Sequence, residues 1–494
     1  MAHVHHTIQA PLQISDCDCQ GEDCPTYVSR QRLARLGPRL AVETAAKEPP
    51  DSMYMNELVN DTLVDPRYRQ YGVSTLYIRQ ILEGRSFPNL KRHWEKPVMG
   101  IINVFAGIFK ARPEQPQDTA IRRELYASYH AIIDVIWKDF GYLTPIGETA
   151  DFRRRGVSKM IAWFLRDDPP MKLEMYEPKT VKLVLQCWLA TPPDSPTLKD
   201  IVTTVTMMFS PRDHLGNSPP PEYLHTAFSA FKISTFVSQI NFILKNKNMD
   251  KESLCREISA ITEFAKDPFL PHLLDAKVHK QVIAAVRKQL KASVEDANTK
   301  ELLTECGLFI QWESTHTMAI FTELLGNTYM VEVGVEALKL AHKSQTYNAE
   351  IWCAFFEQIE HSMTCERREA CDYHATPEFL HAARSSLERV AQPTMIALFP
   401  QNGVRSGSKM KYLLLWKGLV SLLGITEETI RERYRADRKC CNLSCPTRNS
   451  GAQIVKKSTC VQCKAVFYCD RECQRSDWFI HKTECQRLAA TFVE

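Results

Sequence analysis

The feature that most constrains this chain of 494 residues is a cluster of cysteine and histidine side chains near its C-terminus. Eight of its 17 cysteines fall between Cys440 and Cys485, and the remainder are scattered. In a reducing compartment, such a cluster indicates metal binding rather than a disulfide framework. The ligand pairs are Cys440 or Cys441 with Cys445, Cys460 with Cys463, Cys469 with Cys473, and His481 with Cys485. Because zinc takes four such ligands in tetrahedral geometry, four pairs predict two zinc ions.

Residues between the ligands indicate which type of zinc module this is. An aromatic pair precedes Cys469, while Gln474 and the Asp477-Trp478 dipeptide lie between the last two ligand pairs. This arrangement resembles the MYND zinc finger, whose pattern is two Cys pairs, an aromatic residue before Cys-x3-Cys, and His-x3-Cys. The resemblance covers under a tenth of the chain. It implies a small C-terminal two-zinc cross-brace finger, which we assign to residues 438–487.

The interleaved cross-brace of that family also implies which pairs share an ion. By this analogy, one zinc ion takes Cys440, Cys445, Cys469 and Cys473, and the other takes Cys460, Cys463, His481 and Cys485. The order of the pairs along the chain does not by itself establish the interleaving.

The first ligand is ambiguous because two cysteines are adjacent at this position. Starting from Cys440, the opening reads C-x-N-x-x-C with Asn442 in third place, which resembles the long-spaced variant of many MYND fingers, particularly fungal ones. Starting from Cys441, it reads C-x3-C. The first pattern favours Cys440, and Cys441 remains the alternative.

The resemblance implies a peptide-binding surface as well. In the family, the positions matched by Gln474 and Trp478 line a groove for proline-rich peptides such as Pro-x-Leu-x-Pro. Residues four apart share one face of a helix, and a large aromatic ring beside an amide can stack on proline while hydrogen-bonding the peptide backbone. The alternative is that Trp478 packs inside the finger. Val461 replaces a residue that is small and polar in some peptide-binding members, so we expect an altered or lost peptide preference.

Helical periodicity dominates residues 51–437. Apolar residues recur every three or four positions, as in Val278, Val282, Val286 and Leu290. Asn-Gly hairpin signals are almost absent, so few β-hairpins are expected. Helices joined by short loops predict a mainly α protein whose extended body is solenoid-like or an irregular stack of helical hairpins. No fixed period with a tetratricopeptide or ankyrin signature is apparent.

The remaining segments bear on location. Residues 1–50 show little periodicity, which predicts a mobile tail. No run of 18 or more apolar residues occurs, and the N-terminal residues are polar where a secretory signal needs an apolar stretch. We therefore expect no membrane span and a cytoplasmic and/or nuclear protein.

Positive charge is concentrated at the C-terminal end. Residues 431–487 contain 13 Lys or Arg against six Asp or Glu, although thiolate ligation of two zinc ions reduces the net charge to about +4. An alternative function is a nucleic-acid-associated transcriptional regulator that uses the basic segment before the finger. That strip consists of Arg431, Arg433, Arg435, Arg438 and Lys439. Because acidic residues dilute it, we interpret the strip as solvated surface, and nucleic acid is the less favoured partner.

The sequence also bears on whether the protein is an enzyme. MYND fingers accompany a SET methyltransferase domain in one family, where the finger is inserted within the catalytic region. Here the finger follows the helical body, and neither an Asn-His-Ser-Cys-like cofactor motif nor the subsequent cysteine cluster is present. We therefore expect no enzyme and no catalytic residue. The sequence predicts an intracellular zinc-binding adaptor or regulatory protein whose finger contacts a protein partner with a proline-rich segment.

Overall fold

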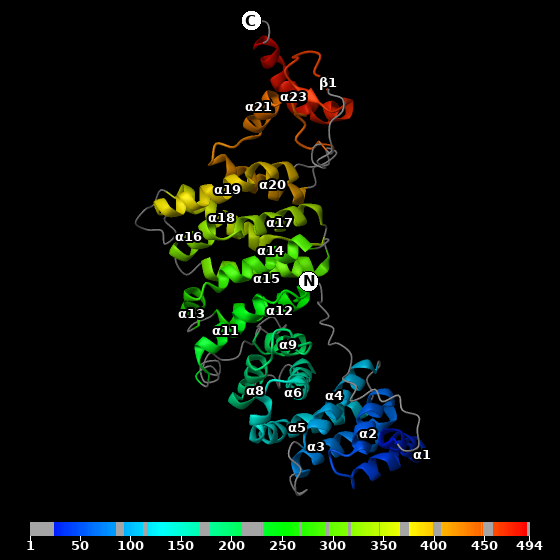
Figure 1. Cartoon of the computed structure of the whole chain (residues 1–494). Helices are drawn as coiled ribbons and strands as arrows, with labels where there is room; N and C mark the ends of the chain where they lie inside the picture. The colour runs from blue at the N-terminus through cyan, green and yellow to red at the C-terminus, as the bar shows by residue number, and fades with distance from the viewer. Residues whose placement is uncertain are drawn as a thin grey trace. The chain divides into compact units, whose positions relative to one another are not determined.

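The computed structural model of this chain is built almost entirely from α-helices (Figure 1), which confirms the predicted mainly α class. It describes residues 24–84, 93–111, 116–167, 177–209, 229, 231–265, 269–292, 296–314, 318–344, 346–365, 375–398, 407–445, 447 and 458–491. The chain divides into two compact units, residues 1–249 and 250–494. None of the described helices combines the length and the apolar character that a bilayer crossing requires.

The first unit is organised around a nearly fully buried helix, α4. Its helices are α1 (Pro25–Ala45), α2 (Met53–Val64), the 3-10 helix η1 (Pro66–Tyr71), α3 (Val73–Glu83), α4 (Glu95–Lys110), α5 (Pro116–Lys138), the 3-10 helix η3 (Phe140–Leu143), α6 (Glu148–Asp167), α8 (Pro178–Leu189), α9 (Leu198–Phe209) and α11 (Ile233–Leu244). Helix α4 packs against α2, α3 and α6. Because its centre reads Ile101-Ile-Asn-Val-Phe105, apolar on all sides, its one amide needs a partner. Asn103 Nδ2 donates to the Val59 carbonyl oxygen at 2.8 Å.

Helix α1 departs from the expectation of a mobile tail over residues 1–50. Residues 1–23 lie outside the described part of the chain, but Pro25–Ala45 is helical, with a kink at Gly37 where φ is 69°. Leu33 and Ala41 are buried, because α1 packs against α2. The kink at Gly37-Pro38 interrupts the apolar periodicity, which explains why the sequence pattern of this helix is weak.

The second unit carries a helical stack and the zinc ligands. Its elements are α12 (Lys251–Phe264), α13 (Leu270–Asp275), α14 (Val278–Ala292), α15 (Ala297–Ser314), α16 (Met318–Asn327), α17 (Met330–Lys343), α18 (Glu350–Thr364), α19 (Pro377–Leu398), α20 (Gly407–Ser421), α21 (Glu427–Ala436), β1 (Ser458–Thr459), β2 (Phe467–Tyr468) and α23 (Arg471–Thr491). Helices α12, α15, α18 and α20 pack in succession, and α14, α17 and α19 form a second row against them (Figure 1).

Within each unit, the stack has a recurring register. Hydrogen bonds join neighbouring helical layers through residues 44 to 51 positions apart: Asn103 to Val59, Tyr129 to Thr180 and Thr204 to Ser158 in the first unit, and Trp352 to Leu303 and Lys300 to Thr346 in the second. One helical hairpin with its loops spans about this length, as in solenoid repeats. The contacting residues differ from one layer to the next. The layers therefore repeat in their spacing but not in their residues, which explains why the sequence carries no repeat signature.

Aromatic rings fill the centre of the second unit. Trp352 donates its indole N–H to the Leu303 carbonyl oxygen at 2.8 Å, and the Phe356 ring meets that of Trp416 edge to face at 5.4 Å between centroids. Gly334 on α17 lies against this group. A Cβ added there would be 2.7 Å from Trp352 Cε3 and 2.9 Å from Phe356 Cζ. Helix α17 approaches α18 closely because position 334 lacks a side chain.

We expect Gly334→Ala to destabilise the second unit by about 1–3 kcal/mol, since the added methyl group overpacks the aromatic centre. Gly326→Ala is the matched control: its Cβ would meet Ala382 Cβ at an ordinary 3.4 Å, so the better helix propensity of alanine should leave stability equal or slightly higher. Hydrogen–deuterium exchange of α17 measures the effect. Equal protection in the two variants would contradict this account of the packing.

Candidate metal centre and interaction surface

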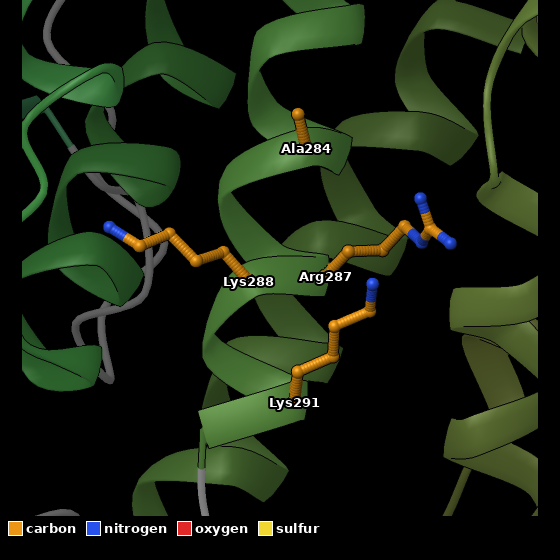
Figure 2. A pocket seen from close by; sticks show the side chains of 4 residues that line it. All are labelled: Ala284, Arg287, Lys288 and Lys291. Atoms are coloured by element: carbon orange, nitrogen blue, oxygen red, sulfur yellow. The ribbon is translucent and has the colours of Figure 1, made fainter.

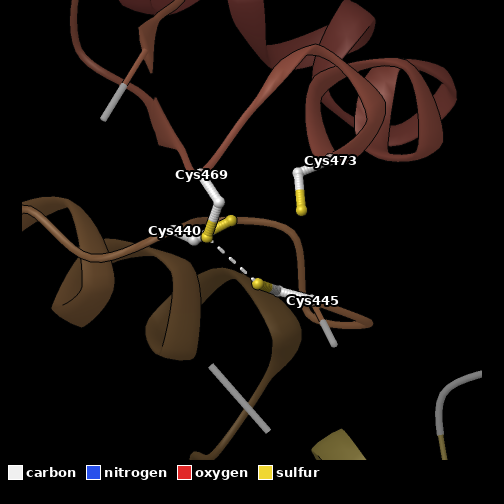
Figure 3. Close-up of side chains that lie close together, drawn as sticks. All are labelled: Cys440, Cys445, Cys469 and Cys473. Atoms are coloured by element: carbon white, nitrogen blue, oxygen red, sulfur yellow. Dashed lines mark hydrogen bonds between the residues drawn. The ribbon is translucent and has the colours of Figure 1, made fainter. Parts of the chain in front are cut away.

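The first group of potential metal ligands joins three separate segments of the second unit. Cys440 and Cys445 follow α21, Cys469 follows β2, and Cys473 lies in the first turn of α23. One ligand atom from each lies within 4.8 Å of the others, and the sulfur atoms of Cys445 and Cys469 are 3.3 Å apart. Figure 3 shows the four side chains converging from the two sides of this site. Four convergent sulfur atoms form a donor set suited to tetrahedral zinc.

The second group contains Cys460, Cys463, His481 and Cys485, all buried. The sulfur atoms of Cys460 and Cys485 are 3.8 Å apart, and Cys463 Sγ lies 3.5 Å from His481 Nε2. His481 and Cys485 are four residues apart on α23, so the helix presents both to the same site. The pairs are thus interleaved as the cross-brace resemblance implies.

Short backbone elements hold the ligand segments in place. Strands β1 and β2 are antiparallel, with Ser458 opposite Tyr468, and they bring the second and third ligand pairs together. The Cys460 N–H donates to the Val466 carbonyl oxygen at 2.9 Å, which closes the turn between them. Asp470 Oδ1 accepts from the Cys473 N–H at 2.7 Å, so the carboxylate caps the start of α23.

The electrostatics of both groups are suited to a bound cation. Burial and the neighbouring Cys445 raise the pKa of Cys473 to about 12, and burial and Cys460 raise the pKa of Cys485 to about 12. These thiols would hold their protons at neutral pH, because clustered thiolates repel each other and lose hydration. A divalent ion displaces the protons and compensates the charge. The donor sets therefore fit two zinc ions.

The positions of the sulfur atoms show which of the two adjacent cysteines faces the metal site. Cys440 is grouped with the other ligands, whereas Cys441 Sγ lies 3.6 Å from the Lys439 carbonyl oxygen. The Cys441 N–H donates to the Phe467 carbonyl oxygen at 2.8 Å. Adjacent residues in this extended segment point to opposite sides, so only one faces the metal site.

A buried ion pair fastens the finger to the preceding helix. Arg431 on α21 binds Asp477 on α23 through both guanidinium nitrogens, at 2.9 and 2.6 Å, with both side chains buried. Arg431 also donates to the Cys441 carbonyl oxygen at 3.2 Å, and the Tyr468 hydroxyl donates to Asp477 at 2.9 Å. A bidentate pair with two further hydrogen bonds compensates both desolvated charges, and among the described residues Arg431 Nε has no hydrogen-bond partner. We call Arg431, Asp477, Tyr468 and the Cys441 carbonyl the clasp.

Sequence reasoning noted Asp477 only as a MYND landmark and placed Arg431 in a basic strip. The clasp shows that helix α21 packs with the finger. Arg435 pairs with Glu428 at 2.6 Å and Glu484 at 3.4 Å. Lys439 pairs with Asp437 at 2.8 Å, so three cations of the strip bind carboxylates within the chain. Apart from the expected landmark at Asp477, no sequence signal links Arg431 to Asp477 or Arg435 to Glu484, because these partners lie 46 and 49 residues apart.

The two predicted peptide-binding residues lie on the outside of α23. Trp478 is 37% exposed, and its ring meets the buried His481 ring edge to face at 5.9 Å. Gln474 is half-buried one turn earlier. Val461 and Phe479 are 87% and 77% exposed. The alternative was that Trp478 packs inside the finger, but only part of its side chain is covered there.

Comparison with known proteins agrees with this geometry. The family model of the MYND finger matches residues 441–485. The match begins one residue after Cys440, but the position of the sulfur atoms decides which cysteine can bind the ion. The C-terminal module is a MYND finger.

Curated relatives are similar over short stretches. The SET domain and MYND-type zinc finger protein 6 of Schizosaccharomyces pombe is 35% identical over 78 residues, which are 15% of this chain and 16% of that protein. The N-lysine methyltransferase SMYD2-A of Danio rerio is 46% identical over 46 residues, 9% of either chain. SMYD2 of Rattus norvegicus is 55% identical over 31 residues, 6% of this chain and 7% of that protein. This chain thus spans less than a fifth of each relative, and the methyltransferases match in the finger region.

Replacing Cys440 by Ser should lower the zinc content of the purified chain from two ions to about one, because a tetrahedral site loses a thiolate. Cys441→Ser is the matched control and should keep both ions, since that sulfur points away from the site. Metal analysis by mass spectrometry reads the result. The reverse pattern would assign the ligand to Cys441.

Replacing Arg431 by Met should destabilise the finger by about 3–5 kcal/mol, because Asp477 is left buried without its partner charge. Arg433→Met, on the exposed side of the same helix, should change stability by less than about 0.5 kcal/mol. Zinc release to a colorimetric chelator during urea titration measures both. Coincident release curves for wild type and Arg431→Met would show that the clasp contributes nothing.

Proposed function

We propose that this chain is a non-catalytic intracellular adaptor whose MYND finger binds a proline-rich segment of a protein partner. The observation that carries the proposal is the position of Trp478. Its ring is partly exposed beside Gln474, on a helix that also supplies zinc ligands. The proposal has two parts: the finger binds a protein, and the bound segment of that protein is rich in proline.

The Trp478 ring has a defined orientation. One edge contact is with His481, whose side chain belongs to the second metal group and is 1% exposed. Zinc ligation of His481 would therefore restrict the ring as well. A pre-oriented aromatic ring loses little entropy on binding, and its remaining face can stack on proline.

Gln474 supplies the polar part of the surface. It lies one helical turn before Trp478 and is half-buried, so its amide shares the helix face that carries the ring. A proline-rich segment in the polyproline II conformation exposes its carbonyl groups, which an amide N–H can bind. An aromatic ring and an amide on one helix face thus match both features of such a segment.

Further apolar surface lies on the same module. The Val461 side chain is 87% exposed, and exposed apolar side chains are typical of interaction surfaces. Val461 stands where some peptide-binding fingers have a small polar residue. We therefore expect the preferred peptide to place an apolar side chain, rather than a polar one, against this position.

The helical body supports an adaptor in a different way. Stacked hairpins give an extended surface that can hold partners apart from the finger. The similarity to methyltransferases is confined to the finger region, which is compatible with a non-catalytic protein that shares only this module. Since thiolate ligands must stay reduced, we place the protein in the cytoplasm or nucleus.

Trp478→Ala should weaken binding of a fluorescent Pro-x-Leu-x-Pro peptide to the full chain at least tenfold, about 1.4 kcal/mol, because the stacking surface is lost. Phe479→Ala is the matched control, an exposed aromatic on the same helix but on another face; it should stay within about twofold. Fluorescence anisotropy measures affinity, and both variants should retain two zinc ions.

A peptide with its prolines replaced by alanine should bind at least tenfold more weakly to the wild-type chain. Unchanged affinity on Trp478→Ala would refute the proposed groove. Equal binding of the proline-free peptide would refute the ligand class while leaving protein interaction by the finger intact.

A further inference from the structure

Helix α14 of the second unit has an unusual charge pattern. Its residues Val278–Ala292 include no Asp or Glu. Val282 and Val286 are buried on its inner side, while Lys288 and Lys291 are exposed on its outer side. An ordinary solvated helix alternates charges of both signs. The outer side of α14 is therefore purely cationic.

A hollow lies on this cationic side. Its volume is about 360 Å³, and it is lined by Ala284, Arg287, Lys288 and Lys291. Figure 2 shows Arg287 and Lys291 extending to the same side of the helix, with Lys288 directed to the other. The small side chain of Ala284 leaves the space between them open. A volume near the lower end of ligand sites suits a few side chains rather than a bulky ligand.

Arg287 is positioned by an aromatic ring. Its guanidinium carbon lies 3.3 Å from the centre of the Tyr329 ring. Among the described residues, no carboxylate oxygen lies within ion-pair distance of Arg287 or Lys291, whereas Arg389, also near this ring, pairs with Glu332 at 3.1 Å. A guanidinium stacked on a ring keeps its N–H groups at the edge, where they can donate to an anion.

We propose that this cationic hollow on α14 binds a short acidic segment of a protein partner. Carboxylate side chains would accept from Arg287 and pair with Lys291, while Lys288 contacts the flank of the segment. The site is separate from the finger and does not rest on the proline-rich ligand.

The surroundings favour a short acidic peptide over a nucleic acid. Arg287 already covers one face of the Tyr329 ring, so that face is not available for stacking a base. The hollow offers three cations, Arg287, Lys288 and Lys291, which are few for a continuous phosphate backbone. Two or three carboxylates on a flexible peptide match this number.

The test uses the full chain and a fluorescent peptide with six Glu in a Gly-Ser background. The peptide should bind, and the affinity should fall as salt rises from low to physiological concentration. Arg287→Glu and Lys291→Glu should each weaken binding at least tenfold. Lys411→Glu, an exposed lysine on α20 of the same unit, makes the same charge change elsewhere and should leave affinity within about twofold of the wild type.

Three results would overturn the proposal. The first is equal loss of affinity in Lys411→Glu, which would indicate general charge attraction. The second is equal binding of a peptide with Gln in place of Glu. The third is tighter binding of a single-stranded oligonucleotide that competes with the Glu peptide, which would assign the hollow to nucleic acid. The circular dichroism spectrum of each variant should match that of the wild type, which shows that a change in affinity is not caused by misfolding.

Discussion

Seven cysteine thiols and one imidazole converge in two small clusters, and as thiolate ligands the cysteines need divalent cations to compensate their charge. The rest of the finger depends on this constraint. Its two strands contain two residues each, and so short a segment has little apolar core of its own. Metal ligation, rather than hydrophobic burial, brings β1, β2 and α23 together.

The clasp extends the influence of the metal sites into the helical body. Arg431 can be buried because Asp477 on the metal-bound helix and the Cys441 carbonyl beside the first ligand accept its hydrogen bonds. Helix α21 is in turn attached to α19, where Gln392 donates to the Tyr434 hydroxyl at 3.1 Å. The finger is therefore continuous with the stack through polar contacts, and not only through the chain.

Much of this organisation could be predicted from the sequence. Ligand spacing indicated the two zinc sites, because metal geometry restricts local spacing closely, whereas their interleaving was implied by the MYND resemblance. The period of Val278, Val282 and Val286 indicated a helix, and all three residues are buried. The role of Arg431 was not predictable, since an arginine in a charged segment looks solvated until its distant partner is known. The register of the stack was hidden for a similar reason: it depends on shape complementarity between layers, which many residue combinations satisfy.

Helix α23 supplies Cys473 to one metal group and His481 and Cys485 to the other. Ordering this single helix is a common requirement of both sites, so its entropic cost is met once, by whichever ion binds first. The second ion then meets ligands already in position. We therefore expect the two ions to bind the wild-type finger with positive cooperativity, and a finger that lacks one ligand to hold its remaining ion more weakly.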